Sequence, residues 1–123
     1  VAFIVDDMDN SATDITTLNF HGVGTGGTAE AAANTALVTE STTALNPDST
    51  RATGTKTQPS ANILRSVGTV TFDGSAAITE HGIFSQAATG GGTLLDRSLF
   101  AAINVAAADS IQFTYDLTFT SGG

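Results

Sequence analysis

The clearest pattern in the chain is an alternation of apolar and polar side chains near its end. Within residues 110–120, the apolar positions Ile111, Phe113, Tyr115, Leu117 and Phe119 alternate with the polar positions Gln112, Thr114, Asp116 and Thr118. Successive side chains of a strand point to opposite faces of the sheet. This period of two therefore predicts a strand with one buried face and one solvent-facing face.

Other segments of the second half are also strand-like and are separated by turn signals. Asp73-Gly74, the glycine-rich residues 88–92 and residues 106–109 are the expected turns. The expected strands are 63–72, with Leu64, Val70 and Phe72 on one face, then 77–84, and 93–105 with a bend near 101–102. Short strands at this spacing predict an all-β fold, a single antiparallel β-sandwich or jelly-roll-like domain.

The first half is less regular. Residues 1–14 read as an acidic N-terminal arm, and residues 15–123 as one β domain that begins with a strand at 15–23, anchored by Ile15, Leu18 and Phe20. Residues 29–39 contain several alanines and predict the one short helix of the chain. Residues 40–61 hold both prolines and predict a long polar loop, with an edge strand near 51–57.

Charge narrows the classes of partner. The net charge is −8, with 4 Lys and Arg against 12 Asp and Glu. Such a chain is repelled by nucleic-acid phosphates and by anionic lipid, so neither nucleic acid nor a membrane is an expected partner. Cysteine is absent, which excludes disulfides and thiolate metal sites. The low charged fraction of 13% is typical of an extracellular or coat protein rather than a metabolic enzyme.

One motif suggests a nucleotide site. Residues 22–27 read GVGTGG, which fits the pattern G-x-G-x-x-G between a strand-like and a helix-like segment. A dinucleotide site also needs a second buried strand after the helix. Here the helix-like segment leads into the polar residues Ser41, Thr42 and Thr43. We therefore expect a turn-forming glycine loop and no cofactor.

The remaining polar clusters give no expected enzyme chemistry. The oxygen-rich segment from Asp6 to Asp14 suggests Ca²⁺, but it lacks the glycine and the glutamate of an EF-hand loop, so a solvated arm is favoured. Glu80 and His81 are adjacent in an expected strand and must point to opposite faces. With no third ligand marked and no G-x-S-x-G elbow, both His81 and His21 are expected to be ordinary strand residues, and the chain is expected not to be an enzyme.

A few charged side chains remain as candidates for contacts between subunits. Arg97 is expected to reach an acidic residue of a neighbouring subunit in preference to lying in solvent. The full set of candidate interface residues is Asp6, Asp7, Asp9, Arg51, Lys56 and Arg97.

Several segments resemble a small β module found in virion proteins of tailed bacteriophages. The matching residues read ITEHGIF at 78–84, GGGTLLDR at 90–97, and DSIQFTY at 109–115, with Phe100 and Ile103-Asn104-Val105 between them. Residues 28–37 also fit the module's A-x-x-T-A-L stretch. The resemblance covers about residues 22–120; residues 1–14 have no counterpart in it.

The resemblance implies a capsid decoration (cement) protein on the outer capsid of the virion. Such proteins commonly form homotrimers that bind the major capsid protein and bridge neighbouring subunits. The alternative within the family is a tail, baseplate or fibre module, with a role in host attachment. A third possibility, a carbohydrate-binding or enzymatic domain, is disfavoured because the chain has no Trp and only 1 Tyr for sugar stacking.

Overall fold

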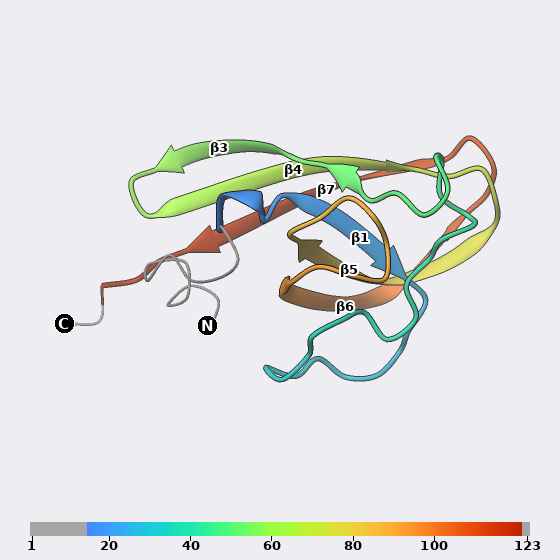
Figure 1. Cartoon of the computed structure of the whole chain (residues 1–123), viewed down its shortest axis with the longest axis horizontal. Coiled ribbons are helices and arrows are strands. Elements are labelled where there is room, and N and C mark those ends of the chain that lie inside the picture. Colours follow the sequence, from blue (N-terminus) through green and yellow to red (C-terminus); the bar gives the residue numbers. More distant parts are fainter. Residues whose placement is uncertain (1–14, 122–123) are drawn as a thin grey trace.

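The computed structural model describes residues 15–121, which form the all-β fold that the sequence predicts (Figure 1). A single 3-10 turn, η1 (Ile15–Thr17), precedes the strands. The strands are β1 (Phe20–Gly24), β2 (Ala52–Thr53), β3 (Thr55–Ser60), β4 (Ile63–Thr71), β5 (Ala76–Phe84), β6 (Leu94–Val105) and β7 (Ser110–Thr118). No helix in this described part is long and apolar enough to span a membrane.

The strands form two antiparallel sheets in a sandwich-like arrangement. One sheet has the order β2-β1-β5-β6, and the other has the order β3-β4-β7. At one edge, β2 passes through Gly54 directly into β3, which joins the two sheets. At the other edge, β6 and β7 are the end strands of their sheets and are connected by the turn at residues 106–109.

The main core lies between the two sheets. Its buried members are Val23, Leu45, Val70, Phe72, Ile78 and Val105. The inward side chains of β7, which include Ile111 and Phe113, pack against this cluster but are only partly buried. The apolar side chains of β7 therefore face the core, as predicted, but the described residues cover them only in part.

A second apolar cluster lies on the opposite face of the four-stranded sheet. It consists of Leu37, Phe84 and Leu94, with Phe20 packed against it. Leu37 comes from residues 25–39, a segment without regular secondary structure that covers this face. The molecule therefore has two sheets and, over one of them, an irregular layer.

The structure confirms the strands of the second half to within two residues and corrects the first half. The predicted bend near 101–102 coincides with a shift of register between β5 and β6, opposite Thr79. The predicted strand at 15–23 begins only at Phe20, after the turn η1. The long polar loop expected at 40–61 is shorter than predicted, because the edge strand expected near 51–57 is present as β2 and β3 on either side of Gly54 and continues to Ser60, where it pairs with β4.

The helix predicted at 29–39 is wrong. Those residues form turns and bends, and the backbone amides of Val38 and Thr39 donate to the side chain of Glu80 instead of to helical carbonyls. Alanine content favours a helix only weakly, and burial of Leu37 against the sheet together with these hydrogen bonds outweighs it.

Candidate functional site

Glu80 is the centre of a buried ion pair on the outer face of the four-stranded sheet. Its side chain is 0% exposed, and its Oε1 lies 2.7 Å from Nε of Arg97, which is also buried. The backbone amides of Gly26, Val38 and Thr39 donate to the same carboxylate at 2.8, 2.9 and 2.8 Å. One side chain therefore fixes both ends of the irregular layer at residues 25–39.

The hydrogen bonds keep this carboxylate ionised. Burial alone raises the pKa of Glu80, but the hydrogen bonds from Arg97 and from the three backbone amides outweigh burial and hold the pKa below its ordinary value. Arg97 also donates to the carbonyl of Thr28 at 2.8 Å. Both charges are thus paired and satisfied within the chain.

A second ion pair fixes the glycine-rich loop after β5. Arg51 binds Glu40 through two hydrogen bonds, Nε to Oε2 at 2.7 Å and Nη2 to Oε1 at 2.9 Å. Its Nη1 donates to the carbonyls of Gln86 and Gly91 at 3.1 and 2.8 Å. The guanidinium also lies 3.5 Å over the ring of Phe84, so its planar charge is held on an aromatic face.

These positions correct the expectation for two of the candidate interface residues. Arg51 and Arg97 are only 2% and 3% exposed, and each is paired with a glutamate of its own chain, so neither guanidinium is available to a neighbouring subunit. Lys56 is exposed on β3 and donates to the carbonyl of Thr16. Asp6, Asp7 and Asp9, and with them the calcium alternative, lie outside the described residues.

Glu80 and His81 point to opposite faces, as the sequence predicts, and His81 belongs to a hydrogen-bonded chain between the sheets. Nε2 of His81 lies 2.8 Å from Nδ1 of His21, and Nε2 of His21 lies 2.8 Å from Oγ of Ser66. The hydroxyl of Ser66 donates to Oδ1 of Asn19 at 2.8 Å, and Nδ2 of Asn19 donates to the carbonyl of Gly54 at 2.5 Å.

The hydrogen bond from Asn19 to the carbonyl of Gly54 fixes which atom is the donor in each of the other hydrogen bonds of this row. A carbonyl only accepts, so Asn19 presents its amide nitrogen to Gly54 and its oxygen to Ser66. The hydroxyl of Ser66 must then donate to Asn19 and accept from Nε2–H of His21. Neutral His21 is left with a bare Nδ1, which accepts from Nε2–H of His81.

The two histidines are held neutral. Burial lowers the pKa of His21 to about 4. Burial, and then the neighbouring His21, lower the pKa of His81 to about 3. Because the hydroxyl proton of Ser66 points toward Asn19, His21 is not placed to act as its base. These hydrogen-bonded side chains therefore form a polar link between the sheets, because His21 and His81 lie in one sheet and Ser66 lies in the other.

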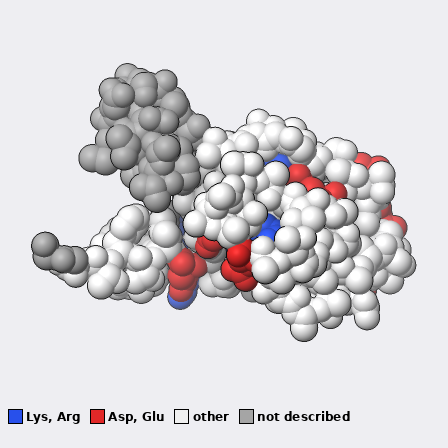
Figure 2. Space-filling view, turned by 90° about the horizontal axis from the view of Figure 1, so that it is seen from below, with Lys and Arg blue, Asp and Glu red and all other residues white. Residues whose placement is uncertain are grey.

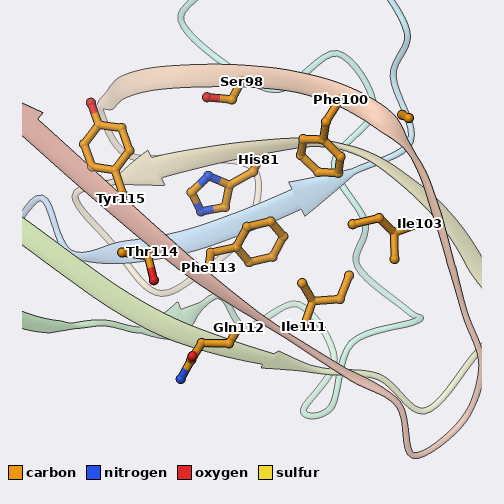
Figure 3. A pocket seen from close by; sticks show the side chains of 10 residues that line it. His81, Ser98, Phe100, Ile103, Ile111, Gln112, Phe113, Thr114 and Tyr115 are labelled. Carbon is orange, nitrogen blue, oxygen red and sulfur yellow. The ribbon is translucent and has the colours of Figure 1, made fainter.

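An open groove lies beside this link, between β6 and β7. Its volume is about 490 Å³, and its lining includes His81, Phe100, Ile103, Ile111 and Phe113. Figure 3 shows the β6 and β7 side chains facing each other across it, with His81 between them. The His81 ring stacks on Phe113, with centroids 4.2 Å apart and planes 12° apart.

The mouth of the groove carries a polar contact. The hydroxyl of Tyr115 on β7 donates to Asp96 on β6 at 3.1 Å. Burial, and then the charge and hydrogen bond of Asp96, raise the pKa of Tyr115 well above its ordinary value, so the phenol remains protonated. This bond connects the two edges at the end of the groove away from the 106–109 turn.

A different apolar surface lies at the tip of the β3–β4 hairpin. We call it the tip platform: Gln58, Ala61, Asn62, Ile63, Leu64 and Phe119, which enclose a shallow hollow of about 260 Å³. Phe119 is 59% exposed and Leu64 is 38% exposed. Asn62 holds Phe119 in place by accepting from its amide at 2.9 Å and donating to its carbonyl at 3.0 Å. The platform is therefore preformed, apolar and uncharged.

Sequence reasoning missed the partners of Glu80 and of the histidines, although one signal was present. The segment from Ile78 to Phe84 is apolar at positions on both faces, which indicates a strand buried on both sides. A charged residue in such a strand must be paired. The next strand, β6, carries Arg97 as its one basic residue.

Within residues 15–121 no group of three His, Asp or Glu side chains is arranged to hold a metal ion. The glycines of the GVGTGG motif instead allow close approach to carboxylates. A Cβ on Gly26 would lie 2.5 Å from Oε2 of Glu80, and one on Gly22 would lie 3.0 Å from Oε2 of Glu40. Comparison of the chain with family models, with curated proteins and with solved structures gives no match.

Proposed function

We propose that this chain is a structural protein of tailed-phage virions, a decoration protein that binds the outer capsid and stabilises contacts between major capsid subunits. The sequence segments that carry the resemblance support this proposal by their arrangement. Residues 78–84, 90–97 and 109–115 fall in β5, β6, β7 and the loops that join them. They are thus successive parts of one folded unit rather than scattered matches.

The tip platform supplies the contact surface and is the observation on which the proposal chiefly rests. It is uncharged in a chain of net charge −8, and it exposes Phe119 and Leu64. It lies at the end of the long β3–β4 hairpin, which is seen in Figure 1. An apolar, preformed projection of this kind gains free energy when a partner covers it. The partner that fits this proposal is the major capsid protein, contacted by several copies around a symmetry axis, with a homotrimer as the expected assembly.

The rest of the surface suits an outward-facing role. Because Arg51 and Arg97 are buried in ion pairs, they place little positive charge on the surface, and Figure 2 shows several separate acidic spots with few basic atoms. A net negative outer surface keeps large particles apart in solution. No catalytic role, cofactor or nucleic-acid contact is part of the proposal.

The number of copies per virion tests this assignment. Quantitative mass spectrometry of purified virions should find the chain in a fixed ratio to the major capsid protein, close to one trimer per local symmetry axis of the shell. Copies in the small multiples of three or six allowed by tail symmetry would reject the capsid assignment and favour the tail alternative. Absence from virions would reject both.

Variants of the tip platform test the contact itself. Phe119→Ser combined with Leu64→Ser should weaken binding to undecorated capsid shells by about tenfold or more, because each removes exposed apolar area from the contact. The matched control is Thr69→Ser, on the exposed outer face of β4, which should bind as the unchanged protein does. Equal binding of the double variant and the control would show that the tip platform is not the contact.

A further inference from the structure

The groove between β6 and β7 is an incomplete edge of the sandwich. β6 pairs only with β5, and β7 only with β4, among the strands of residues 15–121. Each strand therefore presents one side to the groove mouth that no described strand covers, and such an edge readily accepts another strand. Between the two edges, Phe100, Ile111 and Phe113 remain only partly buried.

These two features together specify the chemistry of an occupant. The inward residues Ile111, Phe113 and Tyr115 alternate along β7 over a length of about 13 Å, at the usual rise of a strand. A strand of about five residues added beside β7 satisfies the free backbone edge and places alternate side chains in the groove. The occupant should therefore be short, extended, uncharged and apolar at alternate positions.

The segment that precedes the described residues has this composition. Residues 1–5 read VAFIV, with Val1, Phe3 and Val5 at alternate positions, and Asp6 and Asp7 follow immediately. β-branched and aromatic residues are those that favour strands. The charges that follow would remain in solvent beyond the end of the groove.

The described chain also begins close enough for this segment to reach the groove. The carbonyl of Thr16 accepts a hydrogen bond from the side chain of Lys56 on β3. In the sheet, Lys56 lies opposite Ser66 of β4, and Ser66 lies opposite Tyr115 of β7, which is at the groove mouth. Lys56 and Tyr115 are thus two strand spacings apart, about 10 Å. The nine residues 6–14 can span up to about 30 Å when extended, which exceeds this distance several-fold.

We propose that residues 1–5 of the same chain add as a strand to the free edge of β7, with Val1, Phe3 and Val5 in the groove. The tether favours the chain's own groove over that of a second copy, because a linker that spans the gap gives a high effective concentration. This inference does not depend on the proposed function, since it concerns completion of the sandwich and is tested in solution without virions.

Paired cysteines test the location, because the unchanged chain has no cysteine. In the variant Phe3→Cys/Ser98→Cys the second thiol lines the groove, and oxidation of dilute protein should give a disulfide within one chain. The control Phe3→Cys/Thr69→Cys places its second thiol on the exposed outer face of β4 and should cross-link about tenfold more slowly. Equal rates in the two variants would overturn the proposal.

Hydrogen exchange of the full chain provides an independent readout. Deletion of residues 1–5 should speed exchange of the β7 amides about tenfold, while exchange in β1 stays unchanged because the deletion leaves the core intact. Unchanged exchange in β7 would overturn the proposal. A disulfide formed only between two chains would also overturn it, by assigning the groove to a second copy.

Discussion

At the scale of single residues, two buried ion pairs, Glu80–Arg97 and Glu40–Arg51, fix loops. Glu80 accepts three backbone amides of the irregular layer, and Arg51 donates to two carbonyls of the loop after β5. Neither ion pair is on the surface. Buried pairs of this kind seldom increase stability over an apolar pair of similar size, but breaking one is costly because the remaining charge has no partner.

The Glu80 pair should therefore respond very differently to single and double substitution. Glu80→Gln leaves the buried guanidinium of Arg97 without a carboxylate and should lower the free energy of unfolding by about 3–5 kcal/mol. Glu80→Leu combined with Arg97→Leu should cost less than Glu80→Gln alone. Urea denaturation measures both, with Asp116→Asn at the exposed Arg65–Asp116 pair as a control that changes stability little. A Glu80→Gln variant as stable as this control would contradict the assigned role.

At the scale of elements, the sequence predicted what depends on local pattern. β4 to β7 carry alternation, bulky residues and turn signals such as Asp73-Gly74, so their bounds were predictable. The layer at 25–39 was not, because its conformation depends on Glu80, a residue more than forty positions away. The contact between His21 and His81 is equally non-local, since it spans sixty positions.

Glycines within the strands mark where two elements approach most closely. Gly68 of β4 faces the ring of His21, and a Cβ there would lie 2.8 Å from Cγ of that ring. The absence of a side chain thus lets His21 lie flat between the sheets and reach Ser66.

Gly68→Ala should accordingly force the two sheets apart locally. We expect it to lower the free energy of unfolding by about 1–3 kcal/mol, as overpacking of a core does. The matched control is Gly27→Ala, where an added Cβ meets no atom within 4 Å, and its stability should change by no more than about 0.5 kcal/mol. Thermal or urea unfolding distinguishes them, and equal stability of the two variants would refute the close packing described.

At the scale of the whole molecule, the two sheets are joined by apolar packing and by the chain from His81 through His21 to Ser66. In this row of hydrogen bonds each donor and acceptor is fixed, and Nδ1 of His21 must stay unprotonated because it is an acceptor. Protonation there would place two donors, Nδ1–H of His21 and Nε2–H of His81, against each other at 2.8 Å.

Stability should consequently fall in mild acid. Both folded-state pKa values, about 4 for His21 and about 3 for His81, lie below the ordinary 6.5, so the unfolded state takes up protons first as the pH falls. The stability is complete above pH about 6.5 and declines below it, by roughly 2 kcal/mol per histidine at pH 5. Loss from carboxylates such as Glu80, whose pKa is lowered, begins only below about pH 4.5.

Urea unfolding at pH 7 and pH 5 measures this decline. In the double variant His21→Gln/His81→Gln, neutral amides replace the two titrating rings, and the difference between the two pH values should largely disappear. If the unchanged protein has the same free energy of unfolding at pH 7 and at pH 5, the two rings are not held neutral by burial.

The way the irregular layer is attached has a consequence for how this protein can vary. Glu80 holds Gly26, Val38 and Thr39 through their main chain, so the side chains of Val38 and Thr39 take no part in these bonds, whereas residue 26 must stay glycine because a Cβ there would lie 2.5 Å from Oε2 of Glu80. The exposed stretch at residues 31–33 is therefore open to substitution or to insertion of a foreign peptide without loss of the anchors. Related chains can diversify, or be engineered to display an epitope, on that side while the sandwich beneath stays the same.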